Sequence, residues 1–240
     1  MRSSAILVLA VPFAVFGFTA ETVWSHGDVA PQPVNTDALP DIDETEWALE
    51  NPYRSMDEEV YRTAVSIGAS GYNQNCARCH GLEAVSGGVA PDLRYLEADD
   101  YGDEWYVERF INGYTQNGVN KMPAFGDLLG QKAAWAIRSY IETRPDDGAL
   151  DEFSDDLVGI RDELQSKAAK LSNGTDYDAL APEIDNLKAE LDEIAGQVPA
   201  ASGAEFTDSP ASRAYAALDG TVAGVKQAEE ILTIGLSAAQ

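Results

Sequence analysis

The sequence predicts an all-α protein with an extended N-terminal arm, a first helical domain, and a C-terminal helical bundle or coiled-coil hairpin. Apolar residues recur every three or four positions in several segments, which is the period of an amphipathic helix. Strand-like alternation is absent, and proline and glycine separate the periodic segments. The expected divisions are a signal peptide at 1–25, an arm at 26–56, a domain at 57–144, a linker at 145–150 and an acidic three-helix bundle at 151–240.

The N-terminus has the features of an export signal. Arg2 supplies a positive start, residues 5–20 carry no charge, and the small residues Val23 and Ser25 favour cleavage before His26. This apolar run is short for a membrane span, which needs roughly 20 residues. We therefore expect a protein that is exported to a bacterial periplasm without stable membrane insertion. A retained N-terminal anchor is the alternative.

The arm that follows is expected to lie over the first domain. Four prolines interrupt it, and it has no helical period. Trp47 and Tyr53 are its candidate anchors, because large aromatic side chains bury much apolar area.

Three helices are expected in the first domain. The first covers residues 57–71, with apolar positions spaced near 3.6 residues. The second covers 103–114 and has acids in its first turn, where the helix dipole favours them. The third covers 130–144 and is closed by Pro145. Long glycine-containing loops join the three helices.

A heptad-like rhythm predicts three amphipathic helices in the C-terminal unit. Asn173-Gly174 and Gly196 end the first two, and Ser209-Pro210 begins the third with a serine cap and proline at the first helical position. Residues 145–240 contain 20 acids and 6 bases but no cysteine, histidine or methionine. The expected role of this unit is therefore packing, docking or assembly. The residues expected in its core are Phe153, Leu157, Ile160, Leu164, Ala168, Leu171, Leu180, Ile184, Leu187, Leu191, Ile194, Tyr215, Leu218, Val222, Val225 and Leu232.

The formal charge of the chain is −25, from 41 acids against 16 bases. So strong a negative charge repels nucleic acid and anionic lipid and attracts basic protein surfaces. Nucleic acid is therefore not an expected partner. For most of these acids, solubility alone is a sufficient explanation.

Both cysteines lie in the segment Cys76-Ala77-Arg78-Cys79-His80, and a cysteine pair of this spacing is compatible with four chemistries. A disulfide here would close a loop of two intervening residues and so remove little chain entropy. A thioredoxin-like redox pair requires a surrounding βαβ pattern, whereas this region has the period of helices. A zinc site requires four ligands, and beyond this segment only His26 remains as a histidine or cysteine ligand.

Covalent attachment of haem is the chemistry that fits. Two thiols three residues apart on a helical turn reach the two vinyl groups of one haem, and the next residue, His80, then lies beneath the iron. Such attachment takes place outside the cytoplasm, in agreement with the export signal. We therefore expect one haem c, bound through Cys76 and Cys79, with His80 as an axial ligand of its iron.

The second axial ligand is expected to be Met122. It lies 42 residues after His80 on a loop between two helices, and Pro123 stiffens that loop. Met56 lies too close to the cysteines along the chain to reach the opposite face easily, and His26 would be the new N-terminus. If Met122 were only a core residue, the iron would keep an open sixth site.

Several residues of the first domain follow a recognisable order: Gly68, Tyr72, Cys76, Cys79, His80, Pro91, Met122, Pro123 and Tyr140. This order resembles that of class I c-type cytochromes. The resemblance implies a cytochrome c-like haem domain in which Gly68 lets the first helix closely approach the last one near Tyr140. It also implies that the carbonyl group of Pro91 orients His80 through its second ring nitrogen.

A narrower resemblance covers residues 26–146. The arm, NPYR, NCARCHGLEAVSGGVAPDLR, MPAF and WAIRSYI are similar to the periplasmic cytochromes, of the cytochrome cL and c-550 types, that accept electrons from PQQ-dependent methanol or alcohol dehydrogenases. This implies a one-electron carrier, not an enzyme, with a quinoprotein dehydrogenase as donor and an oxidase or another cytochrome as acceptor. Competing hypotheses are a sensor or peroxidase-like haem protein, and an assembly or docking protein in which the bundle is the main functional part.

Overall fold

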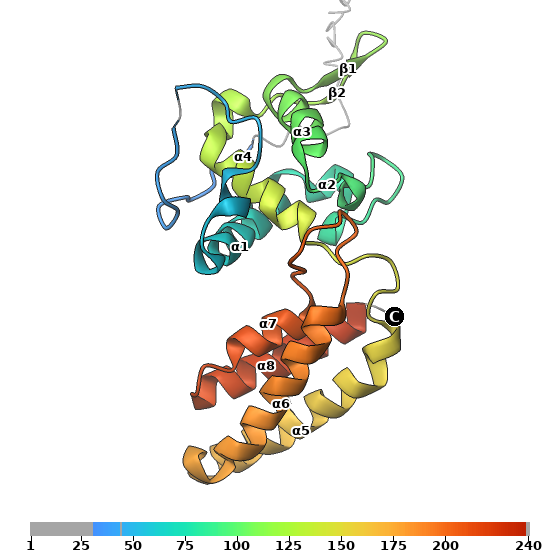
Figure 1. Cartoon of the computed structure of the whole chain (residues 1–240). Helices are drawn as coiled ribbons and strands as arrows, with labels where there is room; N and C mark the ends of the chain where they lie inside the picture. Colours follow the sequence, from blue (N-terminus) through green and yellow to red (C-terminus); the bar gives the residue numbers. More distant parts are fainter. Residues whose placement is uncertain (1–30, 44, 239–240) are drawn as a thin grey trace, which may run out of the picture. The chain divides into compact units, whose positions relative to one another are not determined.

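The computed structural model describes residues 31–43 and 45–238, so the expected signal peptide and His26 lie outside the described residues. Helices dominate the described chain, as the predicted all-α fold class requires (Figure 1). The described residues belong to one compact unit. Among the helices described, none has the length and apolar character needed to cross a membrane.

Three long helices build the first half of the chain. They are α1 (Glu58–Asn75), α3 (Asp100–Asn112) and α4 (Gly126–Glu142), and each overlaps a predicted helix (Figure 1). α3 begins earlier than predicted because the carboxylate of Asp99 accepts a hydrogen bond from the amide of Gly102 at 2.9 Å and so caps the helix.

The close approach of α1 to α4 is the main contact in this half. A Cβ atom at Gly68 would overlap the carbonyl oxygen of Ala136, so the two backbones can meet only where α1 has glycine. Next to this crossing the rings of Tyr72 and Tyr140 lie with their centroids 5.2 Å apart. The helix crossing therefore has the form that the resemblance implied.

One apolar core joins these helices. Its buried members are Leu39, Tyr53, Tyr61, Ala64, Val65, Tyr72, Ala84, Leu93, Tyr106, Val107, Phe110, Phe125, Ala134, Trp135, Ala136, Ile137, Tyr140 and Ile141. Tyr53 is completely buried, and Trp47 packs against this core with its ring centroid 6.3 Å from that of Phe110. Both candidate anchors of the arm therefore contact the first domain.

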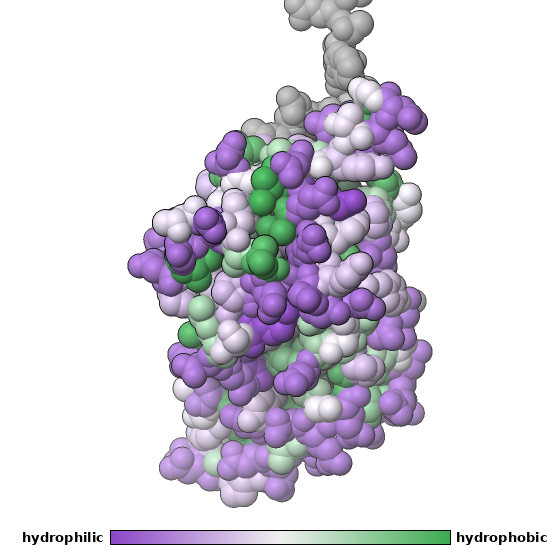
Figure 2. Space-filling view, turned by 45° about the horizontal axis from the view of Figure 1, so that its top comes forward, coloured by the Kyte–Doolittle hydropathy of each residue, from purple (hydrophilic) through white to green (hydrophobic). Residues whose placement is uncertain are grey.

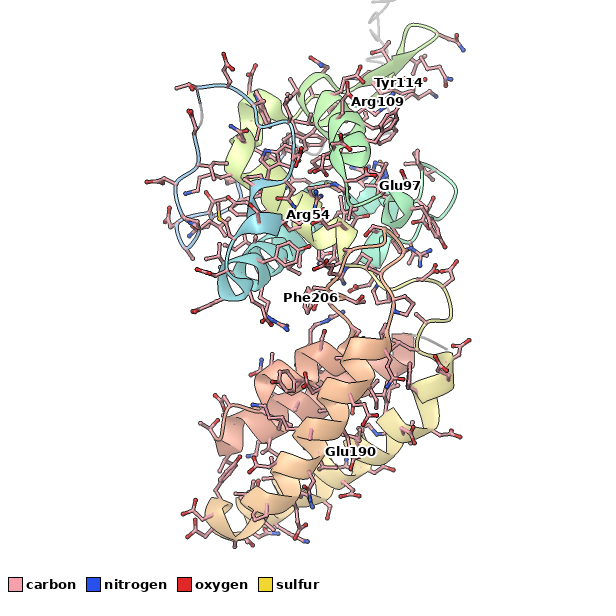
Figure 3. The ribbon with its side chains drawn as sticks, viewed as in Figure 1. Arg54, Glu97, Arg109, Tyr114, Glu190 and Phe206 are labelled. Carbon is pink, nitrogen blue, oxygen red and sulfur yellow. The ribbon has the colours of Figure 1, made fainter. Side chains whose placement is uncertain are left out.

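A cluster of buried charges fastens the end of the arm, which includes a 3-10 helix at Pro52–Ser55, to α3 and α4. Asp103, Arg138 and Glu142 are completely buried. Arg54 donates hydrogen bonds to the carboxylates of Asp103 at 3.0 Å and Glu142 at 2.7 Å, and Figure 3 labels it beside α4. Arg138 donates to Asp103 at 2.8 Å. Each buried charge in this cluster is paired. Burying an unpaired charge would cost several kcal/mol of stability.

A short antiparallel hairpin was not predicted. It consists of β1 (Tyr114–Gln116) and β2 (Val119–Met122). Its turn residues Asn117 and Gly118 have φ angles of 52° and 76°. Asn-Gly is the strongest short-range signal for such a turn, so the sequence did contain the information.

Within the described residues, the C-terminal unit contains four α-helices instead of the three predicted. α5 (Ser154–Ser172) and α6 (Tyr177–Gln197) match the first two predicted helices. The predicted third is divided into α7 (Pro210–Ala217) and α8 (Val222–Ala238). Ser209 caps α7 as expected, with Pro210 in its first turn.

The division of the third helix has a local cause. Gly220 has a φ angle of 87°, and the side chain of Asp219 accepts hydrogen bonds from the amide and hydroxyl groups of Thr221 at 3.0 and 2.6 Å. These contacts end one helix and start another, so that α8 packs on both α5 and α7. Val222, predicted to face the core, stands at the start of α8 and is 37% exposed.

The C-terminal unit has its own apolar core. The buried members are Phe153, Leu157, Ile160, Leu164, Leu171, Leu180, Ile184, Leu187, Leu191, Ile194, Val198, Ala211, Ala214, Leu218, Val225, Ala228, Leu232 and Leu236. The heptad-like rhythm thus predicted the buried face of α5 and α6 well.

The segment 198–209, between α6 and α7, contacts the first half of the chain. The amides of Ala201 and Asp208 donate to the carbonyl groups of Arg144 at 3.0 Å and Thr143 at 2.9 Å. The ring of Phe206, labelled in Figure 3, packs edge-on against Tyr61 with centroids 6.1 Å apart. Backbone and side-chain contacts therefore hold this segment against α1 and the end of α4.

Candidate haem-binding site

The two cysteines and His80 lie on one helical turn. α1 ends at Asn75, and the short helix α2 (Ala77–His80) follows directly. The amides of Cys79 and His80 both donate to the carbonyl oxygen of Cys76, at 3.1 and 3.0 Å. This turn therefore groups two thiols and one imidazole, as the sequence predicted.

The residue after His80 must be glycine. Gly81 has a φ angle of 85°, and a Cβ atom there would overlap the carbonyl oxygen of Val85. The hydroxyl group of Tyr72 donates to the carbonyl oxygen of Gly81 at 2.9 Å, which fastens the turn to α1. The sequence interpretation assigned no role to Gly81 or to this hydroxyl, although a glycine directly after the histidine was a usable signal.

His80 is buried and oriented by a backbone group. Its side chain Nδ1 atom lies 2.9 Å from the carbonyl oxygen of Pro91. A carbonyl oxygen only accepts, so Nδ1 carries a proton and Nε2 is left with a lone pair that can bind a metal. Burial lowers the pKa of His80, while the hydrogen bond to Pro91 opposes that shift. The imidazole is therefore neutral at neutral pH, the form that binds metal ions.

The two cysteines are free thiols that differ in exposure. Cys76 is half-buried and packs against the apolar core, whereas Cys79 is exposed. Burial, with the nearby Cys79, raises the pKa of the Cys76 thiol to about 12. A pair of free thiols on a turn beside a neutral imidazole matches the donor set that haem c requires.

Met122 is the last residue of β2. It is half-buried and packs against the same core as Cys76. The backbone is tight there, because Gly113 has a φ angle of 67° and a Cβ atom on it would overlap the carbonyl oxygen of Met122. The hairpin thus fixes the backbone position of this methionine.

Of the other candidate ligands, His26 lies outside the described residues, and Met56 packs against the same core as Met122. Met56 ends the arm, where its amide donates to the carbonyl oxygen of Tyr53 at 3.2 Å. Within residues 31–43 and 45–238, no group of three or more histidine, cysteine or acidic side chains is suited to hold a metal ion.

The loop that follows His80 has an exposed apolar surface. Leu82, Val85 and Val89 are 73%, 45% and 80% exposed. Figure 2 shows a face of the molecule that is largely hydrophilic, with hydrophobic residues confined to small groups. Three of the exposed large apolar side chains of the described chain therefore follow His80 within nine residues.

Comparisons with known proteins identify the family of this chain. The family model described as cytochrome c oxidase, cbb3-type, subunit III matches residues 63–141. Cytochrome c550 of Pseudomonas aeruginosa is 55% identical over 119 residues, which is 50% of this chain and 81% of that protein. No solved structure matches the chain significantly.

Two more distant relatives are larger than the matching region. The quinohemoprotein alcohol dehydrogenase ADH-IIG of Pseudomonas putida is 33% identical over 84 residues, 35% of this chain and 11% of that protein. The cbb3-type cytochrome c oxidase subunit FixP of Rhizobium meliloti is 30% identical over 98 residues, 35% of this chain and 31% of that protein. Taken with the match to cytochrome c550, these findings place the chain among the class I c-type cytochromes, which are monohaem electron carriers with covalently bound haem c.

Proposed function

We propose that Cys76 and Cys79 hold the haem covalently and that His80 and Met122 are the axial ligands of its iron. The observation that carries this assignment is the hydrogen bond from His80 to Pro91, because it fixes both the tautomer and the direction of the imidazole. Met122 is supported by its place at the end of β2, where the close backbone contact with Gly113 fixes its position.

The bound haem supplies a one-electron ferric–ferrous couple, and a methionine ligand raises the reduction potential of such a couple. The surrounding residues hold the proposed ligand His80 in a fixed position. Only 8% of His80 is exposed, and the hydroxyl group of Tyr72 holds the backbone at Gly81. Because the ligands are held on short, fastened segments, a change of oxidation state requires little rearrangement.

The proposed donor is a periplasmic quinoprotein dehydrogenase that oxidises an alcohol, and the proposed acceptor is an oxidase or another cytochrome. The similarity to a quinohemoprotein alcohol dehydrogenase supports this donor, and the similarity to a cbb3-type oxidase subunit supports this acceptor. Oxidation of an alcohol to an aldehyde releases two electrons and two protons. Two molecules of a one-electron carrier are therefore reduced for each alcohol oxidised.

Docking on such partners is proposed to use the apolar side chains beside His80. Leu82, Val85 and Val89 form an apolar contact area, and apolar area at the centre of an interface favours transient redox complexes. The net charge of −25 then accelerates the encounter with a basic partner surface. The N-terminal sequence and the proposed donor both favour the periplasm as the location.

Stopped-flow reduction of the ferric protein by a purified quinoprotein alcohol dehydrogenase tests this function. We expect rapid reduction whose rate falls as ionic strength rises, because salt screens charge attraction. Val89→Asp should slow reduction at least tenfold, since it places a charge in the apolar contact area. Val222→Asp, the same substitution on α8, is the matched control and should leave the rate within twofold. Failure of the dehydrogenase to reduce the protein, or equal slowing by both variants, would reject the proposed donor contact.

A further inference from the structure

Two arginines and two carboxylates form a closed ring of alternating charge. Arg144 pairs with Glu83, with Nη1 and Oε2 2.5 Å apart, and with Asp208. Arg213 pairs with the same two acids, at 3.6 Å to Glu83 and 3.2 Å to Asp208. Each member thus contacts two partners of opposite sign, and the ring has no net charge.

The ring is anchored inside the protein at Arg144. Its side chain is completely buried and lies over the ring of Tyr140, with 4.0 Å between the guanidinium carbon and the ring centroid. Burial disfavours its charge, but Asp208, Tyr140 and Glu83 outweigh burial and raise the pKa of Arg144. The side chain of Asp208 is 13% exposed and that of Glu83 is 51% exposed. The cost of burying the guanidinium is therefore offset mainly by these two carboxylates.

The ring connects the first half of the chain with the C-terminal unit. Glu83 lies three residues after His80, and Arg144 directly follows the C-terminal cap of α4. Asp208 and Arg213 belong to the segment 198–209 and to α7, outside the residues 63–141 that match the family model. The C-terminal unit therefore supplies one acid and one base to a cluster whose other acid is on the haem-binding loop.

The loop held by the ring has an unfavourable backbone conformation. Glu83 and Ala84 have φ angles of 54° and 61°, which non-glycine residues rarely adopt. Such conformations persist where surrounding contacts hold them. Ala84 is held because it is completely buried. Glu83 is held by its ion pairs with Arg144 and Arg213.

We propose that the C-terminal unit acts on the haem site through this ring, with Asp208 as a positioning residue that holds the loop after His80 through Arg144 and Glu83. Asp208 fixes the position of the Arg144 guanidinium, and Arg144 in turn fixes Glu83. When Asp208 is neutralised, two arginines share one carboxylate, so the ring opens and the loop at 81–85 loosens. Water then reaches the His80 side of the haem more easily. This inference rests on the proposed haem attachment but assigns a function to the C-terminal unit itself.

Two effects of neutralising Asp208 on the reduction potential have opposite signs. Loss of a negative charge alone destabilises the ferric form and raises the potential. Entry of water beside the haem stabilises the more charged ferric form and lowers the potential. A lowered reduction potential would therefore indicate that Asp208 positions the loop, whereas a raised one would indicate only the loss of its charge.

The test compares Asp208→Asn with Asp162→Asn in the full-length haem protein. Asp162 is an exposed acid on α5 that pairs with Arg161, so its substitution removes the same charge from the same unit. We expect Asp208→Asn to lower the reduction potential and to speed amide hydrogen exchange at residues 81–85 at least tenfold. Asp162→Asn should raise the potential slightly or leave it unchanged, without faster exchange. An Asp208→Asn protein that behaves like Asp162→Asn would overturn the proposal.

A second variant keeps the test decisive if Asp208→Asn folds poorly. The side chain of Glu83 is half exposed, so Glu83→Gln is expected to fold, and it too should lower the potential. Combining both substitutions should lower the potential no further than the larger single effect, because both act through Arg144. Additive shifts would mean independent effects and would reject the coupling. An unchanged potential in these variants, with haem still attached, would contradict the coupling and leave the proposed electron-carrier function intact.

Discussion

The Nδ1 atom of His80 lies 2.9 Å from the carbonyl oxygen of Pro91. This hydrogen bond holds the imidazole by its first nitrogen and directs the second away from the backbone. A second ligand for the proposed haem iron would have to come from another part of the chain, and Met122 on the hairpin is the residue proposed for it. Substitution of the methionine is therefore the most direct test of the iron ligands.

Met122→Ala should leave the haem attached and lower the reduction potential substantially, because a sulfur ligand stabilises ferrous iron. Redox titration measures the shift, and the weak near-infrared band of sulfur-ligated ferric iron should disappear. Met56→Ala is the matched control and should change neither quantity. An unchanged potential in Met122→Ala would exclude Met122 as a ligand.

Replacement of both cysteines, Cys76→Ser with Cys79→Ser, should yield protein without covalent haem. The chain has no other thiol, so no alternative thioether can form. Haem staining after denaturing electrophoresis checks this result, and the same staining of Met122→Ala is the positive control. A normal haem stain in the double variant would refute covalent attachment at these residues.

Gly68→Ala should destabilise the protein by about 3 kcal/mol or more, because the new methyl group overlaps the backbone of α4 at Ala136 and rigid cores resist such insertion. Gly159→Ala on α5 is the matched control. Apart from the neighbouring backbone of α5, no described atom lies within 4 Å of its added Cβ, and alanine is the better helix former by about 1 kcal/mol. Urea unfolding should therefore give opposite signs for the two variants, and equal effects would argue against a close crossing at Gly68.

Asp92→Asn should reduce stability at neutral pH but not at low pH. Burial alone would raise the pKa of Asp92, but hydrogen bonds from the side chain and amide of Arg94 hold it below its usual value. The ionised carboxylate therefore stabilises the folded protein above the unfolded pKa of about 3.9. That contribution disappears as the pH falls through the lower folded-state pKa. Thermal unfolding at pH 7 and near pH 2 measures the difference, which should shrink with acid; a constant difference would contradict this origin.

Local patterns in the sequence were sufficient to predict most helices and the cysteine–histidine turn. The spacing of apolar residues predicted the positions of the long helices. The motif at Cys76–His80 could be recognised because its residues are adjacent in sequence. The hairpin at 114–122 was missed because its strands are too short to show alternation. The signal that could have revealed it was the pair Asn117-Gly118.

Long-range pairing of charges could not be predicted from the sequence. With 41 acids and 16 bases, each arginine has many possible partners. Nothing in the neighbourhood of Arg54 or Arg144 indicates that they bind carboxylates 88 and 64 residues away, respectively Glu142 and Asp208. Such choices follow from the packing of whole helices, which periodicity alone does not specify.

The complete burial of Arg144 has a practical consequence for anyone who shortens this protein. Of the two acids that pair with its guanidinium in the described part of the chain, removal of residues 151–240 would leave only the half-exposed Glu83, and it would also uncover Tyr61 where Phe206 packs. The isolated haem domain would then carry a defect at the cut surface, and its altered redox behaviour would be mistaken for a property of the natural domain. A shortened protein would therefore have to keep Asp208 as a partner for the buried Arg144.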